Sequence, residues 1–410
     1  YLYKLKYRMR GIMKIGIVTL IYATKFDNYG GTLQNYALSQ VLSDMGHEVS
    51  TIALYYSKEQ FWIYRKIRRK LYCKYGIDVR ISKKGIQCAK VEKYQKKRND
   101  NFLQFRSEKI HTDTRWIEKN NFRNLDSEYD LFIVGSDQVW NPFYIDICRS
   151  YFLDFVPDEI RKFSYAASIS VNSLTEHEAN TMIPLIKRME SISVREKSAK
   201  TILEKYIQEK PISVELDPTL LLDECDWNKI CNDKDYMNKG KYIFCYFLGD
   251  NKLHRKATKR IAKRTGLKVI TLPYMLGRFR ICDAFFGDEK LYDVGPSEFI
   301  GLIKNAEYVF TDSFHAVVFS SIYHKKFFVF KRDSDTDKNS MNSRITDILD
   351  DFGIPERLIS DDGSISDELL YSNIDYCKKD KFINKRREES INYLKKALSG
   401  EKQWKKMLVN

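Results

Sequence analysis

The chain of 410 residues exceeds the size of about 250–300 residues at which a single hydrophobic core stops growing, which predicts two domains. Its 43% hydrophobic and 14% aromatic residues exclude global disorder. No stretch reaches the roughly 18–20 consecutive apolar residues of a membrane span, and residues 1–10 lack the apolar run of a signal peptide. We therefore expect a cytoplasmic protein.

The net charge of +15 is distributed unevenly along the chain. Residues 62–100 hold fourteen Lys and Arg against three acids, and we call this segment the basic insert. Such a surplus suits nucleic acid, an anionic membrane surface or an anionic substrate. The eight cysteines form no C-x-x-C pair and do not cluster with the six histidines, so we expect reduced structural thiols and no metal site.

The first predicted elements form a βαβ unit. The β-branched run KIGIVTL (14–20) predicts a buried parallel strand, and TLQNYALSQVLSDMG (32–46) has apolar residues at helical spacing before a terminal glycine. The run HEVSTIAL (47–54) supplies a second strand. This order predicts a right-handed crossover into a parallel sheet.

The same alternation returns after the basic insert and again after the polar stretch 225–241. In the first half it occupies 129–137, 161–170, 176–189, 191–206 and 211–222. In the second half it occupies 241–250, 254–266, 268–274, 296–306 and 308–332. The patterns predict an α/β protein with two Rossmann-like, doubly wound domains that face each other across a cleft. We expect domains over 12–224 and 240–377, and a helical tail over 378–410 that crosses back to the first domain.

In open parallel sheets, ligands bind at the carboxyl ends of the strands, where helix N-termini and backbone N–H groups converge. The first such exit, FDNYGGTLQNYAL, combines two adjacent glycines with neutral amides, which favours a sugar over a phosphate. A tight turn with a polar cap is the alternative. The candidate acceptor-binding residues are Asn28, Tyr29, Gly30, Gly31, Gln34 and Asn35.

The second exit, IVGSDQVWNP, carries a candidate base and a candidate stacking surface. Asp137 is placed to accept a proton, and Trp140 to stack on a ligand. Ser136 and Gln138 lie beside them as further acceptor-binding candidates. Alternatively, Ser136 or Asp137 simply caps the next turn.

The third exit, SISVREKSAK, sets two cations at a strand-to-helix junction. Arg195 and Lys197 there would bind an anion together with the helix dipole. An exposed ion pair with Glu196 or Glu204 is the alternative.

The fourth exit lies in YVFTDSFHAVVFSSIYHKKFFVF, where a polar Thr-Asp-Ser turn separates an apolar strand from an apolar helix. His315 opens that helix, a position suited to anion binding or proton transfer. A buried histidine with satisfied hydrogen bonds is the alternative. Downstream, MNSRI supplies Asn342 and Arg344, and Arg344 would complete a cationic pocket.

The ordered motifs NYGGTLQNYAL, VGSDQVWNP, SYAASIS, SVREKSA, ELDPTLLL, VGPSEFIGLIKNA, TDSFHAVVFS and MNSRI resemble the polysaccharide pyruvyl transferase family. The resemblance implies a GT-B-like fold, phosphoenolpyruvate as donor and a sugar diol as acceptor. It places the enzyme in bacterial capsular or exopolysaccharide synthesis. Ser313 stands where many members carry arginine, and Ala316 where many carry glycine, so another cation must hold the phosphate.

The implied reaction makes a cyclic ketal from an enol phosphate and needs an acid, a base and several cations. His315 would donate the proton, since histidine titrates near pH 6.5. Asp137 would accept a proton from the acceptor hydroxyl. The donor anion would be held by Arg195, Lys197, Ser313, Asn342 and Arg344. Phosphoenolpyruvate enters as a co-substrate, and no cofactor is expected.

Two rival functions stay open at this stage. A nucleotide-sugar glycosyltransferase would share the fold, but that class often holds the ribose with an acid of the C-terminal lobe, and none lies between His315 and Arg332. A nucleic-acid-binding protein would explain the aromatic residues within the basic insert, but not the strand-exit motifs. We therefore expect no nucleic-acid partner.

The basic insert has more charge than phosphoenolpyruvate requires. If the acceptor is linked to a polyprenyl diphosphate, the enzyme works beside an anionic leaflet, and we expect the insert to dock it on the inner membrane face. The insert also carries Trp62, Tyr64 and Tyr72, whose rings suit the headgroup zone. A solvated insertion that keeps the protein soluble is the alternative.

Overall fold

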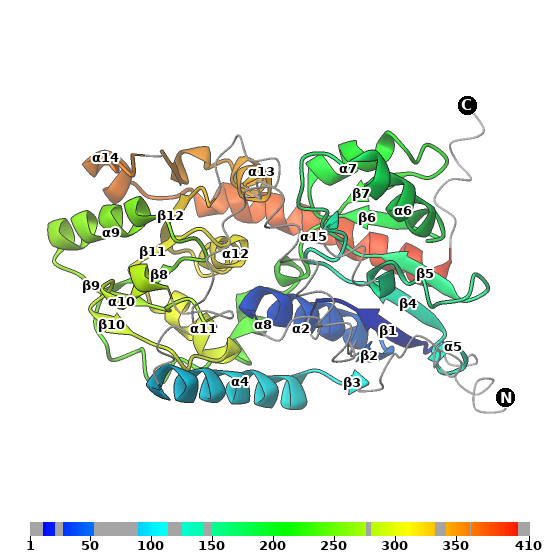
Figure 1. The fold of residues 1–410 in the computed structure, drawn as a ribbon, viewed down its shortest axis with the longest axis horizontal. Helices are drawn as coiled ribbons and strands as arrows, with labels where there is room; N and C mark the ends of the chain where they lie inside the picture. The colour runs from blue at the N-terminus through cyan, green and yellow to red at the C-terminus, as the bar shows by residue number, and fades with distance from the viewer. Residues whose placement is uncertain are drawn as a thin grey trace.

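The computed structural model describes residues 11–20, 28–52, 89–113, 125–142, 149–275, 280–332, 342–360 and 362–400. These residues form two α/β lobes joined side by side (Figure 1). Residues 62–88 of the basic insert lie outside the described ranges, and residues 89–100 form the first half of a helix.

The first lobe is built on a parallel five-stranded sheet in the order β3-β2-β1-β4-β5. Its strands are short and nearly all buried, as the apolar runs predict. They are β1 (Lys14–Val18), β2 (Glu48–Ile52), β3 (Thr112–Asp113), β4 (Leu131–Val134) and β5 (Arg161–Ser164). A parallel pair, β6 (Ile192–Val194) and β7 (Ile212–Val214), continues this edge through isolated bridges from Ala167 to Asp137 and to Val194.

The helices of the first lobe connect these strands. Asn28 caps the first of them by accepting from the backbone N–H of Gly31 at 2.6 Å. The helices are α2 (Tyr29–Asp44), α4 (Ala89–Lys109), α5 (Leu125–Glu128), α6 (Glu176–Lys187), α7 (Lys197–Glu204) and α8 (Glu224–Asn228), with 3-10 turns η3 (Arg149–Phe152) and η4 (Pro218–Leu220).

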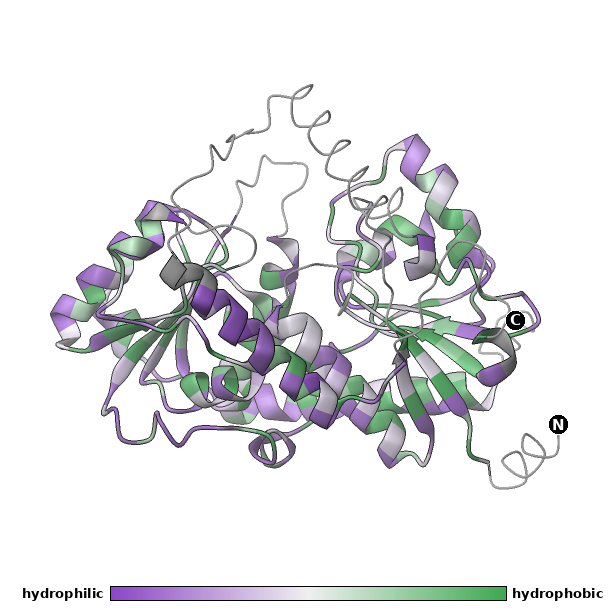
Figure 2. Ribbon diagram, turned by 60° about the horizontal axis from the view of Figure 1, so that its bottom comes forward, coloured by the Kyte–Doolittle hydropathy of each residue, from purple (hydrophilic) through white to green (hydrophobic). Residues whose placement is uncertain are grey.

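The second lobe holds a parallel six-stranded sheet in the order β10-β9-β8-β11-β12-β13. The strands are β8 (Tyr242–Tyr246), β9 (Lys268–Thr271), β10 (Glu289–Lys290), β11 (Tyr308–Thr311), β12 (Lys326–Phe330) and β13 (Leu358–Ile359). The helices are α9 (Lys252–Thr265), α10 (Ile281–Ala284), α11 (Pro296–Lys304), α12 (Phe314–Ile322), α13 (Ser343–Phe352) and α14 (Asp367–Tyr371), with a 3-10 turn η5 (Pro355–Arg357). In Figure 2 the strands of both sheets are mostly hydrophobic.

The last helix, α15 (Tyr376–Ser399), runs from the second lobe across the first (Figure 1). The hydroxyl of Tyr393 donates to the Ser164 carbonyl at 2.8 Å. Arg161 donates to the carbonyls of Ala397 and Leu398 at 2.7 and 2.8 Å. The prediction of a C-terminal helix that returns to the first domain is therefore confirmed.

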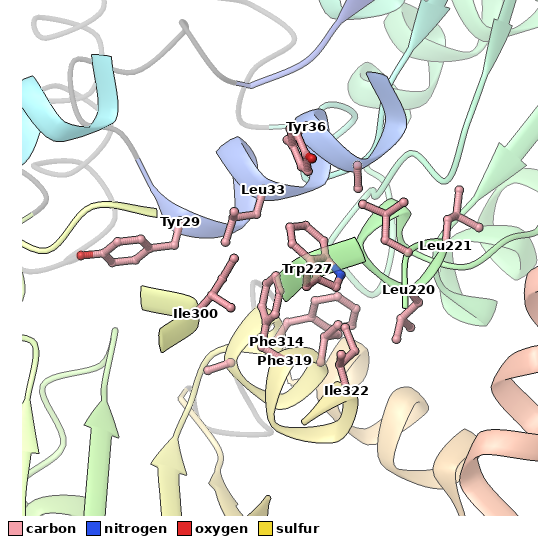
Figure 3. Packing of buried hydrophobic residues seen from close by; sticks show 14 of the residues in the cluster. Tyr29, Leu33, Tyr36, Leu220, Leu221, Trp227, Ile300, Phe314, Phe319 and Ile322 are labelled. Atoms are coloured by element: carbon pink, nitrogen blue, oxygen red, sulfur yellow. The ribbon is translucent and has the colours of Figure 1, made fainter. Parts of the chain in front are cut away.

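The two lobes share one apolar core. Tyr29 at the start of α2 stacks on Phe299 of α11 with ring centroids 4.3 Å apart. Trp227 meets Phe319 of α12 edge-on at 4.8 Å, and Figure 3 shows it between α2 and α12. This packing fixes the N-terminus of α2 against the N-terminus of α12, and so brings strand exits from both lobes together.

Candidate active site

The candidate site lies where the chain order of both sheets reverses. The first sheet reverses between β1 and β4, and the second between β8 and β11. Open parallel sheets bind ligands outside the carboxyl ends of strands at such points. Residues that follow β1, β4, β6, β7 and β11 meet here, because the lobes pack with these ends facing each other.

His315 belongs to the second lobe and contacts residues of the first. It is the second residue of α12, and its side chain is 10% exposed. Its Nε2 lies 3.5 Å from Oδ2 of Asp217. On its other side the ring packs against Gly30, where a Cβ would lie 2.0 Å from Nδ1. The first of the two glycines is therefore required for the imidazole to fit between the lobes.

Asp217 is the buried carboxylate that links the segments of the site. It follows β7 and caps the 3-10 turn that begins at Pro218, with Oδ1 accepting from Thr219. Its Oδ2 accepts from Arg195 Nη1 at 2.7 Å and from Ser136 Oγ at 3.1 Å. Burial raises the pKa of Asp217, but His315 and Arg195 outweigh it and hold that pKa well below its usual range. The carboxylate is therefore ionised and ties together three strand exits.

Arg195 follows β6 and is buried under an aromatic ring. Its guanidinium lies 4.5 Å from the ring centroid of Phe314, a cation–π geometry. Burial lowers the pKa of Arg195, but the charges of Asp217 and Glu196 raise it above the ordinary value. Its Nε and Nη2 have no hydrogen-bond partner among the described residues. Nε also lies 3.6 Å from Oε2 of the buried Glu196, so Nη2 is the donor left for an anion while Nη1 holds Asp217.

Arg344 brings a second buried guanidinium to the same place. It lies in the first turn of α13, and with the side-chain oxygen of Gln138 turned toward it, Gln138 accepts from Nη1 and Nη2 at 3.0 Å each. Burial, and then the charges of Arg195 and Arg332, lower the pKa of Arg344 to about 10. Cations from both lobes thus converge, and a bound anion would relieve their repulsion.

Asp137 stands at the edge of this cluster in a left-handed backbone conformation, with φ of 69°. Its Oδ1 accepts from the backbone N–H of Gln138 at 2.9 Å. Its Oδ2 would lie 3.3 Å from a Cβ added to Gly31. The second glycine therefore gives Asp137 room beside the start of α2, and a non-glycine residue at positive φ is the kind of strain found at functional sites.

The polysaccharide pyruvyl transferase model matches residues 28–334, which is most of the chain. The matched range includes the strand-exit residues described above. Arg344, in the first turn of α13, lies beyond it. The chain belongs to the polysaccharide pyruvyl transferase family. The resemblance found in the sequence is therefore confirmed, and the protein is a transferase.

This transferase has a GT-B-like fold, as its similarity to one solved structure supports. The S. aureus MnaA–UDP co-structure is 12% identical with a TM-score of 0.51, covering 94% of this chain and 97% of that one. A UDP-GlcNAc 2-epimerase from Methanocaldococcus jannaschii, solved with UDP-GlcNAc and UDP, is 14% identical, with coverages of 95% and 99% and a TM-score of 0.47. The E. coli ADP-heptose lps heptosyltransferase II is 10% identical, with coverages of 92% and 99% and a TM-score of 0.34. Comparison with curated proteins gave no match.

Several predicted acceptor residues of the transferase point into the core instead. Gln34 and Asn35 are fully buried and donate to Thr19 and Thr51, each at 2.8 Å. Trp140 is fully buried, and its indole N–H donates to the Tyr151 carbonyl at 3.3 Å. These three side chains pack within the first lobe in this structure, and their assignment to the acceptor stays a prediction.

Tyr29 likewise has a structural partner. Its hydroxyl donates to the Val294 carbonyl of the second lobe at 2.9 Å. Its ring lies between Phe299 and the guanidinium of Arg98, 5.1 Å from its centroid. Tyr29 thus holds the lobes together in this structure, and its assignment to the acceptor stays a prediction. Asn28 acts as the helix cap, as the alternative reading had it.

Among the predicted donor-binding residues, Lys197 lies away from the cluster. It is exposed, and its Nζ pairs with Oδ1 of Asp351 at 2.6 Å. It therefore links α7 to α13 instead of joining Arg195. Asn342 accepts from the backbone N–H of Arg332 at 3.1 Å, and Ser313 is the N-cap of α12 with its own N–H bonded to Thr311. Both sit at the edge of the site.

Sequence reasoning missed Asp217, although ELDPTLLL was among the motifs of the resemblance. The signal was present, since an aspartate that ends a predicted strand and precedes proline is placed at a strand exit. It also missed Glu196, which was treated only as a surface partner of Arg195. Glu196 is buried and accepts from Ser168 and from the backbone N–H groups of Ile169 and Ser170 at 2.6–3.2 Å.

None of the helices in the described ranges is both long enough and apolar enough to cross a bilayer. Within the same ranges, no three His, Cys, Asp or Glu side chains lie together as metal ligands would.

Proposed function

We propose that this transferase moves the pyruvyl group of phosphoenolpyruvate onto two hydroxyls of a sugar, forming a cyclic ketal and releasing phosphate. The observation that supports this best is the contact of His315 with the buried Asp217–Arg195 pair of the other lobe. This contact places a proton donor beside anion-binding groups. It lies where the two lobes meet, at the points at which the strand order of each sheet reverses.

The reaction balances without an added oxidant or reductant. One acceptor hydroxyl adds to the carbon that bears the phosphate, while the methylene carbon next to it gains a proton. The carbon–oxygen bond to phosphate then breaks, and the second hydroxyl adds to the same carbon. The two hydroxyls lose one proton each. One of these protons restores the acid that protonated the methylene carbon, and the other leaves with phosphate.

The donor has a carboxylate and a phosphate, and the site has cations for both. Arg195 offers its Nη2, and Arg344 offers its Nε, which is also buried without a hydrogen-bond partner among the described residues. We assign Arg195 and Arg344 to the donor, with Arg332 contributing charge from the end of β12. These guanidinium groups would take the role of the arginine that many family members have in place of Ser313.

His315 and Asp137 supply acid and base in this proposal. His315 donates to the methylene carbon, and Asp137, which lies on the other lobe beside Gly31, accepts from the first hydroxyl. Because Gly30 covers one edge of the imidazole, the lobes must separate for the donor to enter. The acceptor would then bind near Gly31, Ser136 and Gln138.

The acceptor is a sugar or a polysaccharide, as the family implies. We propose that it belongs to a capsular polysaccharide or exopolysaccharide under construction in the cytoplasm, carried on a polyprenyl diphosphate. Phosphoenolpyruvate serves as co-substrate, and the chemistry requires neither a cofactor nor a metal.

The test is phosphate release from phosphoenolpyruvate with a panel of free and lipid-linked sugars, together with the mass of the modified sugar. Acceptor-dependent phosphate release and a sugar that gains a pyruvyl ketal are expected. Release of a nucleoside diphosphate from a nucleotide sugar, with phosphoenolpyruvate untouched, would instead make the protein a glycosyltransferase.

A further inference from the structure

The outward face of α9 carries a straight row of lysines. Lys252, Lys256, Lys259 and Lys263 follow one another at helical spacings of four, three and four residues, and all are exposed. We call these four residues the lysine ridge. The opposite face of the helix, including Thr258 and Ile261, is buried against the second lobe. The ridge spans about 16 Å, since each helical residue rises 1.5 Å.

The ridge is the part of α9 whose charge is not neutralised. The arginines on the flanks of the helix have partners: Arg255 pairs with Asp283, Arg264 pairs with Asp367, and Arg260 donates to the Gly363 carbonyl. No ion pair joins a ridge lysine to any acid of the described residues. A protein that needed α9 only as a solvated cover would not require four unpaired charges in one row.

An exposed aromatic ring lies beside the ridge. Phe285, just after α10, is 82% exposed, and its carbonyl accepts from Lys259 Nζ at 3.0 Å. Leu253, which adjoins Lys252 and is 43% exposed, lies at the other flank. Large apolar side chains left in water beside lysines are typical of surfaces that touch the headgroup and acyl boundary of a bilayer.

The ridge begins close to the candidate active site. α9 starts three residues after Gly249, where an added Cβ would lie 2.9 Å from Asp312 and 3.3 Å from Arg332. From there the helix extends along the outer edge of the second lobe, beside α14 (Figure 1). A flat anionic surface touching the ridge would therefore lie next to the edge where the strands of the second sheet end.

We propose that the lysine ridge and Phe285 form a docking surface for an anionic phospholipid bilayer. Each lysine attracts the negative headgroups and Phe285 enters the headgroup zone. Nucleic acid would also attract the lysines. Its bases stack on successive aromatic rings, however, and Phe285 and Leu253 do not form such a row. The surface consists of residues of the second lobe, and the proposal does not depend on the proposed reaction.

The test is co-sedimentation of the full chain with vesicles of phosphatidylglycerol and phosphatidylcholine in equal parts, and with vesicles of phosphatidylcholine alone. The wild type is expected to pellet with the anionic vesicles only, and less at high salt, since the attraction fades within a Debye length of about 10 Å at 0.1 M. Changing all four ridge lysines to glutamine is expected to weaken partitioning by about 600-fold, since each lysine near the surface contributes about fivefold.

Two further variants separate the ridge from general charge. Phe285→Ser keeps every lysine. This variant should bind the anionic vesicles at low salt, but the salt concentration that releases it should be lower than for the wild type. The matched control changes four exposed lysines of α15 to glutamine, Lys381, Lys385, Lys395 and Lys396, and should bind as the wild type does. Unchanged thermal unfolding shows that each variant folds.

Three outcomes would overturn the proposal. Equal loss in the α15 control would mean that net charge alone binds vesicles. Wild-type binding by the ridge variant, with loss only when Arg65, Lys66, Arg68, Arg69 and Lys70 are neutralised, would assign docking to the basic insert. Binding to an oligonucleotide duplex that the ridge variant loses, without vesicle binding by the wild type, would make the ridge a nucleic-acid surface.

Discussion

His315 combines two contacts that no other histidine of the described residues has. One side of its ring faces the carboxylate of Asp217, and the other packs on Gly30. A histidine packed between a carboxylate and a glycine of the other lobe is held in one orientation, which general acid catalysis requires. The residue-scale predictions therefore concern His315, Arg195 and Asp217.

Replacing His315 by glutamine is expected to lower kcat for pyruvyl transfer by about two to four orders of magnitude, the usual contribution of a general acid. Steady-state phosphate release measures this. His177→Gln, on the exposed face of α6, is the control and should act as the wild type does. If the His315 variant keeps near-normal turnover, another group donates the proton.

Changing Arg195 to lysine should reduce kcat/KM for phosphoenolpyruvate by tenfold or more, although the charge is kept. A lysine has no planar fork, so it cannot hold Asp217 and donate to the substrate from the same group. Lys197→Gln is the matched control, since Lys197 pairs with Asp351 at the surface. Equal kinetics in the Arg195 variant and the wild type would remove Arg195 from donor binding.

Asp217→Asn is expected to destabilise the protein by about 3–5 kcal/mol at neutral pH, because Arg195 and His315 lose a buried counter-charge. The pKa of Asp217 is depressed in the folded state, so its contribution is complete above the unfolded pKa of about 3.9 and is lost as the pH falls below it. Urea unfolding at a series of pH values should therefore show a wild-type advantage that shrinks below about pH 4. An advantage that stays constant down to pH 3 would contradict this assignment.

At the scale of elements, α15 shows how a terminal helix is fixed to a distant strand. Its last carbonyls would lack partners, and Arg161 at the start of β5 supplies them with two donors. Gly400 then ends the helix at φ of 76°, with Arg161 Nη2 packed 3.1 Å from where its Cβ would lie.

Arg161→Ala should release the final turn of α15 without unfolding the lobe. Two hydrogen bonds to a charged donor are lost, so we expect about 2–3 kcal/mol of destabilisation and faster amide exchange over 395–400. Hydrogen exchange read by mass spectrometry measures this locally. Arg188→Ala removes an arginine of the same lobe that pairs with Asp158, and should leave exchange in α15 unchanged.

At the scale of the whole molecule, the two lobes meet at the site, where Gly30 of the first lobe packs against His315 of the second. Gly30→Ala is expected to cut kcat by about 100-fold or more, because the added Cβ would overlap the His315 ring and hold the lobes apart. The helix itself should gain about 0.5–1 kcal/mol, since alanine favours a helix more than glycine does.

Activity, thermal unfolding and the radius of gyration in solution together test this closure. Gly31→Ala is the graded control, because its Cβ would approach only flexible side chains at 3.1–3.3 Å. Full activity in the Gly30 variant would show that catalysis does not use the closed arrangement of lobes.

The sequence by itself determined the elements, the two-lobed α/β fold and the family, because these depend on local periodicity and on motifs in a fixed order. It also identified His315, Arg195 and Asp137 as strand-exit residues, since polar side chains after buried strands are visible in the chain, and Arg344 as a cation downstream of them. Their chemical roles stay predictions. The order of strands in each sheet decided where those exits lie.

Only the tertiary structure decided which polar residues face the site. Gln34 and Trp140 are close in sequence to Gly31 and Asp137, yet they are buried in the first lobe, because the direction of a side chain depends on how its element packs. Asp217 looks like a turn residue until β7 and α12 are placed together, and then it binds groups from three other segments. A pattern along one chain specifies which face of an element is apolar, but the partner of a polar atom is set by distances between elements far apart in the sequence.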